Sequence, residues 1–479
     1  MEGNLSRRNF LKKSALGLSY LALGSMFNCC SKGTKSPNFV IIFTDDQGYK
    51  DVGCFGAQNF KTPHLDKMAD NGRIFTDFHV ASPVCSPSRA ALLTGCYPQR
   101  VGIPTVLFPE GPFWTEGKTK IGLSKNEITI AEMLKQKDFA TACIGKWHLG
   151  HHKQFLPTNH GFDEYFGLPY SNDMRPETHP DYPPLPLLDG TEVVEENPDQ
   201  SQLTRKYTER AVKFINQNQN KPFFLYLAHT MPHVPLYCSE KFKGKSKQGM
   251  YGDVIMEIDW SVGQIMTALK ANDLDQNTLV IFTSDNGPWT VFGNHAGSAD
   301  PLRGCKQTTF EGGQRVPCIM KWKDRVPAGT ICKEFATTMD ILPTLASMTN
   351  SRLPDKKIDG YNISHLIFGK GKQTTPYEAF YYYDGNTLKA IRSGKWKLHL
   401  PHNFKGVKKP GMDGKMGEYF YDKIELSLFN LENDIDEDNN VAQQYPEVVE
   451  RMLKYAEQAR RKLGDKDKKG IEVREPGKV

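Results

Sequence analysis

A cysteine lies in the string CSPSR, at residues 85–89, in a setting that could bind an anion. Pro87 suits the first turn of a helix, and Gly95 suits the residue that ends it. Cys85 would therefore lie at or just before a helix N-terminus, where free backbone N–H groups attract negative charge. Arg89, one turn further on, can point back toward the same anion. The pattern predicts a cysteine in an electropositive pocket. For a cysteine considered alone, a buried residue at a helix start is the alternative.

Two pairs of oxygen-bearing side chains each follow an apolar run of the chain. The pairs are Asp45 with Asp46 and Asp285 with Asn286. Carboxylate and amide oxygens are the ligands that hard cations such as Ca²⁺ and Mg²⁺ prefer. A single acidic pair is more often part of a turn or a helix cap. Two pairs at the ends of two buried strands instead predict a cation site.

Cationic side chains occur in three further segments that could face the same anion. They are Lys146 and His148 in 145–150, His229 and His233 after the apolar run 223–228, and Lys306 in 303–313. A lysine or histidine taken alone is usually solvated or satisfied within the core, so none is assigned a role by its type.

The elements that must position these residues alternate between apolar runs and helical patterns. Residues 37–44, 223–228 and 279–284 are apolar on both faces, which is typical of buried parallel strands. Helical patterns lie over 255–269 and over 130–134, the latter after a capping box predicted at Ser124 and Glu127. The alternation predicts an α/β fold with a large, mostly parallel sheet and helices on both faces. Ligands of such folds lie beyond the carboxyl ends of the strands, where the polar segments occur.

The pattern changes after about Leu353. Residues 381–400 predict two short strands joined by a turn, and Leu428–Leu431 could add a third. Pro446 opens an amphipathic helix. We therefore expect a smaller C-terminal antiparallel sheet with a terminal helix, and a charged, frayed tail over 464–479.

Length and composition exclude several classes of protein. The chain has 479 residues, of which 38% are hydrophobic and 24% charged, a composition typical of a folded globular protein. The net charge of +6 is too weak and dispersed to indicate a nucleic-acid partner. Ten cysteines in a chain of this length are too few for a disulfide framework.

The first thirty residues have the pattern of an export signal. Arg7 and Arg8 resemble a twin-arginine signal, and the apolar run 15–27 is too short for a membrane span. Cys29 or Cys30 is a candidate lipid anchor. The residues before Cys29, Phe27 and Asn28, match poorly the small residues that usually precede a lipidated cysteine. Incidental cysteines in an ordinary leader are the alternative. The leader predicts an exported protein, periplasmic or an outer-membrane lipoprotein of a bacterium.

The chain resembles the formylglycine-dependent (type I) sulfatase family, arylsulfatase-like, within the alkaline-phosphatase superfamily. The string 85–89 followed by Thr94-Gly95 matches the family signature in full. Further matches are TDDQGY (44–49), GKWHLG (145–150), HGFDEYFGLPYSND (160–173), SDNGP (284–288) and GCKQTTFEGG (304–313). The resemblance divides the chain into an export signal (1–30), a catalytic domain (37–353) and a C-terminal subdomain (354–479), with an alkaline-phosphatase-like fold.

The resemblance implies that Cys85 is oxidised to formylglycine by a separate maturation enzyme. One hydroxyl of the hydrated aldehyde would attack the sulfur of a sulfate ester, and the second, once deprotonated, would expel sulfate. One Ca²⁺, rather than Mg²⁺, would be bound by Asp45, Asp46, Asp285, Asn286 and the oxygen that Cys85 acquires.

The resemblance also implies roles for the cationic residues. Arg89 and Lys146 would stabilise the hydrated aldehyde and the developing charge, and His148 would be the base. Lys146, Lys306, His233 and Ser171 would contact the sulfate, with His233 as proton donor to the leaving oxygen. His233 fits the family pattern of a histidine one residue before a proline. His229 does not, and is left as a structural or neighbouring residue.

The predicted substrate is a sulfated carbohydrate, of glycosaminoglycan or algal origin, or a small sulfate ester. Matches in 145–173 and 304–313 lean toward arylsulfatase A and N-acetylgalactosamine-6-sulfatase, and loops 101–120, 172–200 and 288–303 would set specificity. One alternative is a phosphonate or phosphate ester hydrolase of the same superfamily. Others are a non-catalytic sulfated-glycan-binding homologue and a hydrolase that uses Cys85 as a thiol nucleophile with His148. We expect no nucleic-acid partner, and we expect contact with a membrane only through the candidate lipid anchor.

Overall fold

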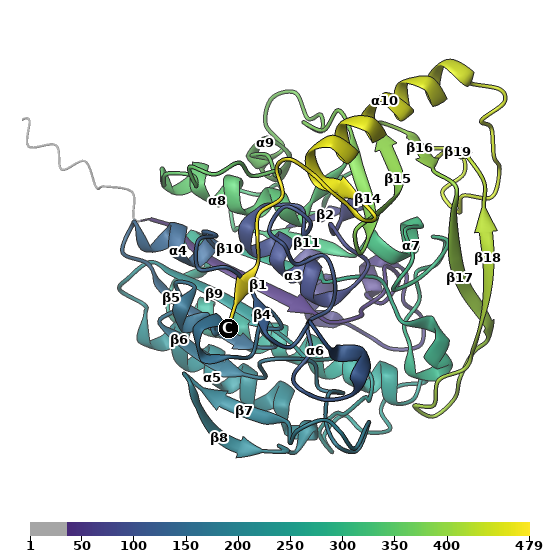
Figure 1. Ribbon diagram of the computed structural model, residues 1–479. Coiled ribbons are helices and arrows are strands. Elements are labelled where there is room, and N and C mark those ends of the chain that lie inside the picture. Colours follow the sequence, from purple (N-terminus) through teal and green to yellow (C-terminus); the bar gives the residue numbers. More distant parts are fainter. Residues whose placement is uncertain (1–35) are drawn as a thin grey trace, which may run out of the picture. The chain divides into compact units, whose positions relative to one another are not determined.

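A ten-stranded sheet forms the centre of the computed structural model, which describes residues 36–479 (Figure 1). Its strands lie in the order β12 (Thr330–Cys332), β2 (Arg73–Phe75), β11 (Cys318–Lys321), β10 (Thr278–Ser284), β1 (Asn38–Thr44), β9 (Phe223–Ala228), β5 (Ala140–Gly145), β6 (Glu164–Gly167), β7 (Pro186–Asp189) and β8 (Glu192–Glu196). The five central strands from β10 to β6 are parallel, whereas β11, β7 and β8 are antiparallel to their neighbours. The predicted mostly parallel sheet is confirmed. The export signal and lipid anchor predicted within residues 1–30 lie outside the described residues.

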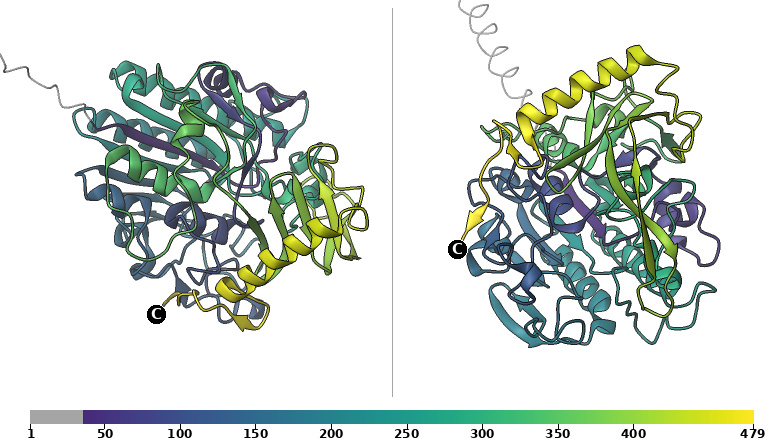
Figure 2. Two further views of the ribbon diagram at one scale, coloured as in Figure 1. Left: turned by 90° about the horizontal axis from the view of Figure 1, so that it is seen from above. Right: turned by 45° about the vertical axis from the view of Figure 1, so that its right-hand side comes forward.

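Helices cover both faces of the sheet because both faces of its central strands are apolar (Figures 1 and 2). On β1, Phe39, Ile41 and Phe43 pack in one core cluster, and Val40 and Ile42 pack in the other. The first cluster holds residues of α3 (Cys85–Thr94), α4 (Ile130–Lys135) and α8 (Ile341–Thr349). The second holds residues of α2 (Pro63–Asp70), α5 (Leu203–Gln217) and α6 (Met250–Ala271). Because successive side chains of a strand point to opposite faces of the sheet, each central strand contributes to both core clusters.

The register of the central strands brings their carboxyl ends to one edge. Thr44 of β1 pairs with Ser284 of β10, and Ala228 of β9 pairs with both Phe43 and Gly145. The polar residues that follow each strand are therefore neighbours in space.

The capping box of α4 differs from the predicted one. It is formed by Thr129 and Glu132, not by Ser124 and Glu127. Ser124 caps only a local turn by accepting from the N–H of Asn126, while the Glu127 carboxylate binds Arg474. The prediction was wrong because Glu127 has a partner far away in the sequence.

The C-terminal part contains the predicted small antiparallel sheet. Its strands lie in the order β14 (Phe380–Asp384), β15 (Thr387–Ser393), β16 (Trp396–His399) and β19 (Ser427–Asn430). Helix α10 (Pro446–Leu463) covers it, with Val448, Met452 and Ala456 in the shared core. The hairpin of β17 (His402–Lys409) and β18 (Glu418–Ile424) was not predicted. The remaining short elements are β3 (Phe78–His79) paired with β13 (Ala336–Thr337), β20 (Gly464–Asp465) paired with β21 (Lys468–Lys469), α7 (Glu311–Gln314) and α9 (Ser364–Phe368).

The tail over 464–479 is packed rather than frayed, which corrects the prediction from its charge. Arg474 Nη2 lies 2.6 Å from Glu127 Oε2, and Glu472 Oε2 lies 2.7 Å from Arg100 Nη1. Strand β22 (Gly477–Lys478) pairs with β4 (Ile121–Gly122). Two of the charges that suggested solvation, on Glu472 and Arg474, instead have partners in the N-terminal half of the chain.

None of the helices within residues 36–479 combines the length and the apolar character that crossing a bilayer would require.

Candidate active site

Cys85 is the first residue of α3, so the predicted helix is present. The helix ends at Gly95, whose φ of 68° is the left-handed conformation that glycine adopts readily. Cys85 is 3% exposed. Burial raises the pKa of its thiol, and the opposing charges of Lys146 and Lys306 do not overcome that effect. A thiol with a raised pKa is a weaker nucleophile than a thiolate.

The four predicted oxygen ligands converge at the ends of β1 and β10. Asp45, Asp46, Asp285 and Asn286 are at most 3% exposed. The Asp46 N–H donates to Asp285 Oδ1 at 3.1 Å, and Asn286 Nδ2 donates to Asp46 Oδ1 at 2.7 Å. Among residues 36–479, Asp45 Oδ1 and Asn286 Oδ1 are buried without a hydrogen-bond partner. Buried polar atoms are usually paired, so these two converging oxygens are candidate ligands for a cation.

Three buried cations surround the carboxylates. Arg89 Nη2 lies 2.9 Å from Asp45 Oδ2 and 2.8 Å from Asp285 Oδ2. Lys146 Nζ lies 2.5 Å from Asp45 Oδ2, and Lys306 Nζ lies 2.7 Å from Asp46 Oδ1. Burial alone would raise the pKa of Asp45, but Lys146 and Arg89 hold it below its usual range. The pKa of Asp285 rises to about 7, first through burial and then through the charge of Asp45.

His148 is held as a neutral imidazole with one free nitrogen. Its Nε2 lies 2.9 Å from the carbonyl oxygen of Leu107. Because a carbonyl can only accept, Nε2 carries the proton and Nδ1 is an acceptor, which is buried and unpaired in the described part of the chain. Burial lowers the pKa of His148 well below its usual value, and Lys146 and Arg89 lower it further. A neutral histidine can accept a proton.

His233 faces the acidic group from the end of β9. Its Nδ1 lies 2.6 Å from the carbonyl oxygen of Val234, and its Nε2 lies 3.7 Å from Asp46 Oδ2. Asp45, Asp46 and His233 form one group with the spacing of metal ligands. His229 points elsewhere, with Nε2 3.3 Å from the hydroxyl of Ser261 on α6.

Ser171 and Trp289 complete the surroundings of the lysines. Lys146 Nζ donates to Ser171 Oγ at 3.0 Å. Trp289 lies 5.6 Å from the His233 ring, and Lys306 Nζ lies 4.4 Å from the Trp289 ring centroid. The sequence placed Trp289 only in a specificity loop. The contact between the Leu107 carbonyl oxygen and His148 was not predicted. A backbone carbonyl is present at every residue, so the sequence carries no signal for such a contact.

The buried oxygen cluster and the N-terminus of α3 lie together beyond the ends of parallel strands, where ligands of α/β folds bind, as in hydrolases of the alkaline-phosphatase superfamily. Residues 37–351 match the Sulfatase family model, and residues 375–473 match the model for the C-terminal region of aryl-sulfatase. The chain belongs to the sulfatase family, and it is a sulfatase enzyme.

Curated relatives support the same assignment. The chain is 39% identical to N-acetylgalactosamine-6-sulfatase of Canis lupus familiaris, over 76% of this chain and 72% of that protein. It is also 39% identical to arylsulfatase A of Bos taurus, over 76% of this chain and 75% of that protein.

Among solved structures, a sulfatase from Pseudoalteromonas sp. superimposes with a TM-score of 0.79 and 26% identity. That match covers 95% of this chain and 94% of the other. The protein Ps i-CgsB, solved in complex with k-i-k-neocarrahexaose, has a TM-score of 0.72 and 29% identity, and covers 88% of this chain and 92% of the other.

The predicted localisation is wrong. The curated relatives are proteins of dog, cow, human and rat, not of bacteria, which contradicts a bacterial periplasmic protein or outer-membrane lipoprotein. A basic start followed by a short apolar run marks a chain for export. Those features are too general to specify the organism or the compartment.

Proposed function

We propose that this protein hydrolyses sulfate esters of carbohydrates, with small aryl sulfates as surrogate substrates. The observation that carries the proposal is the buried group around Cys85. Arg89, Lys146 and Lys306 lie there beside a helix N-terminus, in a chain of the sulfatase family. Fixed positive charge of this kind stabilises the charge that develops on a sulfuryl group during transfer. The names of the relatives and the saccharide in the Ps i-CgsB complex support a carbohydrate substrate.

The acidic group would hold Ca²⁺, through Asp45, Asp46, Asp285 and Asn286. The donors fit, because all are oxygens, and two of them, on Asp45 and Asn286, are buried and unpaired within the described chain. Ca²⁺ accepts buried cages of protein oxygens, whereas Mg²⁺ usually retains several waters. When bound, the ion would polarise the sulfate and orient the nucleophile.

Cys85 would be converted to formylglycine by a maturation enzyme, as the family resemblance implies. One hydroxyl of the hydrated aldehyde would attack sulfur while the ester S–O bond breaks and the alcohol leaves with a proton. The second hydroxyl would then lose its proton and expel sulfate, which restores the aldehyde, and an oxygen of the hydrated aldehyde would complete the ligands of the ion. Arg89 and Lys146 lie where they would stabilise that group, and Nδ1 of His148 is free to accept a proton. Lys146, Ser171, Lys306 and His233 would contact the sulfate.

We further propose that residues 37–353 are the catalytic domain, 354–479 the C-terminal subdomain and 1–30 an export signal. Contacts of the β17–β18 hairpin support a role for the C-terminal part in shaping the site. Tyr419 OH accepts from Trp289 Nε1 at 2.8 Å, and Lys405 donates to Gln307, the neighbour of Lys306.

The proposal is tested with sulfate and phosphate monoesters of the same alcohol. A sulfate ester carries one negative charge and a phosphate ester about two near neutral pH. We expect kcat/KM for the sulfate to exceed that for the phosphate by about 10²-fold or more, equivalent to about 2.7 kcal/mol. Preference for the phosphate or a phosphonate would favour the second candidate, although the phosphonate monoester hydrolase of Agrobacterium radiobacter, at 18% identity, shares only the fold. A panel of defined sulfated saccharides then identifies the sugar, and activity on aryl sulfates alone would contradict the carbohydrate substrate.

Removing divalent cations is expected to abolish turnover reversibly. Without the ion, the oxygens Asp45 Oδ1 and Asn286 Oδ1 remain without a partner in the described chain, and the ligands are not held in the arrangement that the ion would impose. Turnover of an aryl sulfate is measured after treatment with a calcium chelator and gel filtration, and again after Ca²⁺ or Mg²⁺ is added. Full activity in the chelated protein, with no bound metal by elemental analysis, would disprove the metal site.

His233→Gln should slow substrates with poor leaving groups more than substrates with good ones. A general acid contributes about 10²–10⁴-fold when the leaving oxygen needs a proton, and much less for a stable phenolate. The measurement compares kcat/KM for an alkyl or sugar sulfate with that for a nitrophenyl sulfate. His229→Gln is the matched control, since that imidazole binds Ser261. An equal loss on both substrates would indicate that His233 only binds sulfate.

A further inference from the structure

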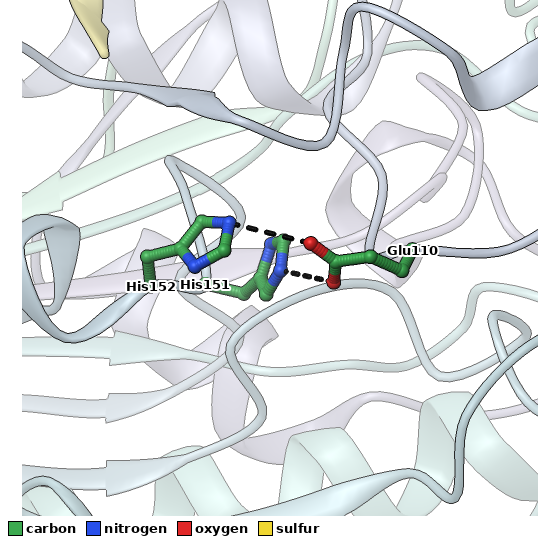
Figure 3. A group of neighbouring side chains, drawn as sticks. All are labelled: Glu110, His151 and His152. Atoms are coloured by element: carbon green, nitrogen blue, oxygen red, sulfur yellow. Dashed lines mark hydrogen bonds and ion pairs between the residues drawn. The ribbon is translucent and has the colours of Figure 1, made fainter. Parts of the chain in front are cut away.

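A second group of metal-binding side chains lies beside the active site, outside the residues assigned above. Glu110 Oε2 lies 2.9 Å from Nε2 of His151, and Glu110 Oε1 lies 3.4 Å from Nε2 of His152. Figure 3 shows both imidazole rings presenting a nitrogen to the same carboxylate. The side chains are 57%, 15% and 26% exposed in the order Glu110, His151, His152, so ions can reach the group from solvent. We propose that these three residues bind a transition-metal ion of the Zn²⁺ type.

The distances suit a tetrahedral ion. One ligand atom from each residue lies within 4.8 Å of the others. Metal–ligand bonds of about 2.0–2.1 Å place the corners of a tetrahedron about 3.3 Å apart. The separations of 2.9 and 3.4 Å, which run from the two imidazoles to different oxygens of Glu110, are close to that value. The carbonyl oxygen of Thr119 lies 3.0 Å from Nε2 of His152 and accepts its proton in the metal-free protein.

The donor types select the ion. Two imidazole nitrogens with one carboxylate are typical of Zn²⁺, and also suit Ni²⁺ and Cu²⁺. Ca²⁺ prefers oxygen donors only. The buried group of Asp45, Asp46, Asp285 and Asn286 offers oxygens, so the two groups would take different metals.

The backbone around the group is already fixed by the active site. Leu107, three residues before Glu110, donates its N–H to Ser86 Oγ at 3.1 Å, and its carbonyl oxygen lies 2.9 Å from His148 Nε2. On the other side, Leu149 accepts from the N–H of Leu123 at 2.8 Å. The rings of His151 and His152 pack together with centroids 4.2 Å apart. Metal binding would therefore require little ordering of the backbone. The proton on Nε2 of each imidazole would move to Nδ1 or be released to solvent, so that both Nε2 atoms could bind the ion.

The test is calorimetric titration of the full chain with Zn²⁺ at neutral pH, in saturating Ca²⁺. We expect one site that is weakened at least tenfold in Glu110→Gln and again in His151→Gln, because each removes a ligand. His365→Gln is the matched control, since that half-buried histidine lies outside the group and bonds the backbone carbonyl of Thr374, and the change should leave the affinity unchanged.

Anomalous scattering at the zinc edge from wild-type crystals soaked in Zn²⁺ should show a peak between Glu110, His151 and His152. Unchanged affinity in both cluster variants, or a soaked crystal without that peak, would overturn the proposal. Neither measurement uses turnover, so the outcome is independent of the proposed sulfatase reaction.

Discussion

Cys85→Ser is expected to reduce turnover of sulfate esters by roughly 10⁴-fold or more, the scale of loss when a covalent nucleophile is removed. A serine that remains unoxidised at position 85 lacks the aldehyde proposed for the wild-type residue. It could accept one sulfate, but it lacks the second hydroxyl that would expel the product. The variant should therefore stop after one transfer of sulfate to the serine. Mass spectrometry of the peptide containing position 85 should detect that one retained sulfate.

Two controls separate this chemistry from damage to the fold. Cys54→Ser changes a half-buried free cysteine outside the site and should retain full turnover. Wild-type protein should lack a thiol at position 85 and resist alkylation. A wild-type thiol whose alkylation abolishes turnover, with no effect of chelators, would instead support a cysteine nucleophile acting with His148.

Glu311→Gln is expected to lower the free energy of unfolding by about 3–5 kcal/mol, because it breaks a buried ionic network by removing one partner. Glu311 begins α7 and is fully buried. Its carboxylate lies 2.9 Å from Lys397 Nζ and 3.1 Å from His79 Nε2, and accepts from Tyr382 OH at 2.9 Å. Burial alone would raise its pKa, but Lys397 and His79 hold the pKa well below its usual value.

The network joins the two parts of the described chain. Lys397 and Tyr382 belong to the C-terminal sheet, whereas His79 and Glu311 belong to β3 and α7, which precede it in the chain. Asp77, His79 and Glu311 also have the spacing of metal ligands. Arg315 and Arg392 already lie within 3.7 Å of these acids, so their charge is balanced by protein cations.

The measurement is urea unfolding at pH 7. Because the pKa of Glu311 is depressed in the folded state, its stabilisation is complete above the unfolded value and is lost as pH falls below it. The difference between wild type and Glu311→Gln should therefore shrink in acid. Glu432→Gln is the control, since that exposed carboxylate lies 3.6 Å from Lys395, and a change within about 0.5 kcal/mol is expected. A comparably small change for Glu311→Gln would show that the network is not stabilising.

Much of the candidate site could be predicted because its signals are local. An apolar run of seven residues followed by two aspartates defines a buried strand and the polar residues at its end, whatever surrounds them. The helix from Cys85 to Thr94 follows from Pro87 and Gly95 in the same way. The tail and the capping box were mispredicted because Arg474 and Glu127 lie 347 positions apart, and neither reveals the other in a local pattern.

The sequence by itself therefore determined the chemical groups, the strands and helices that carry them, and the family. Only the tertiary structure decided which groups meet. Asp45 and Asp285 lie together because β1 and β10 pair in parallel with Thr44 opposite Ser284, although 240 positions separate the two aspartates. His148 presents Nδ1 because a backbone carbonyl 41 positions away accepts from Nε2. Local patterns encode conformation, but pairing between distant segments depends on packing and hydrogen bonds that exist only once the chain has folded.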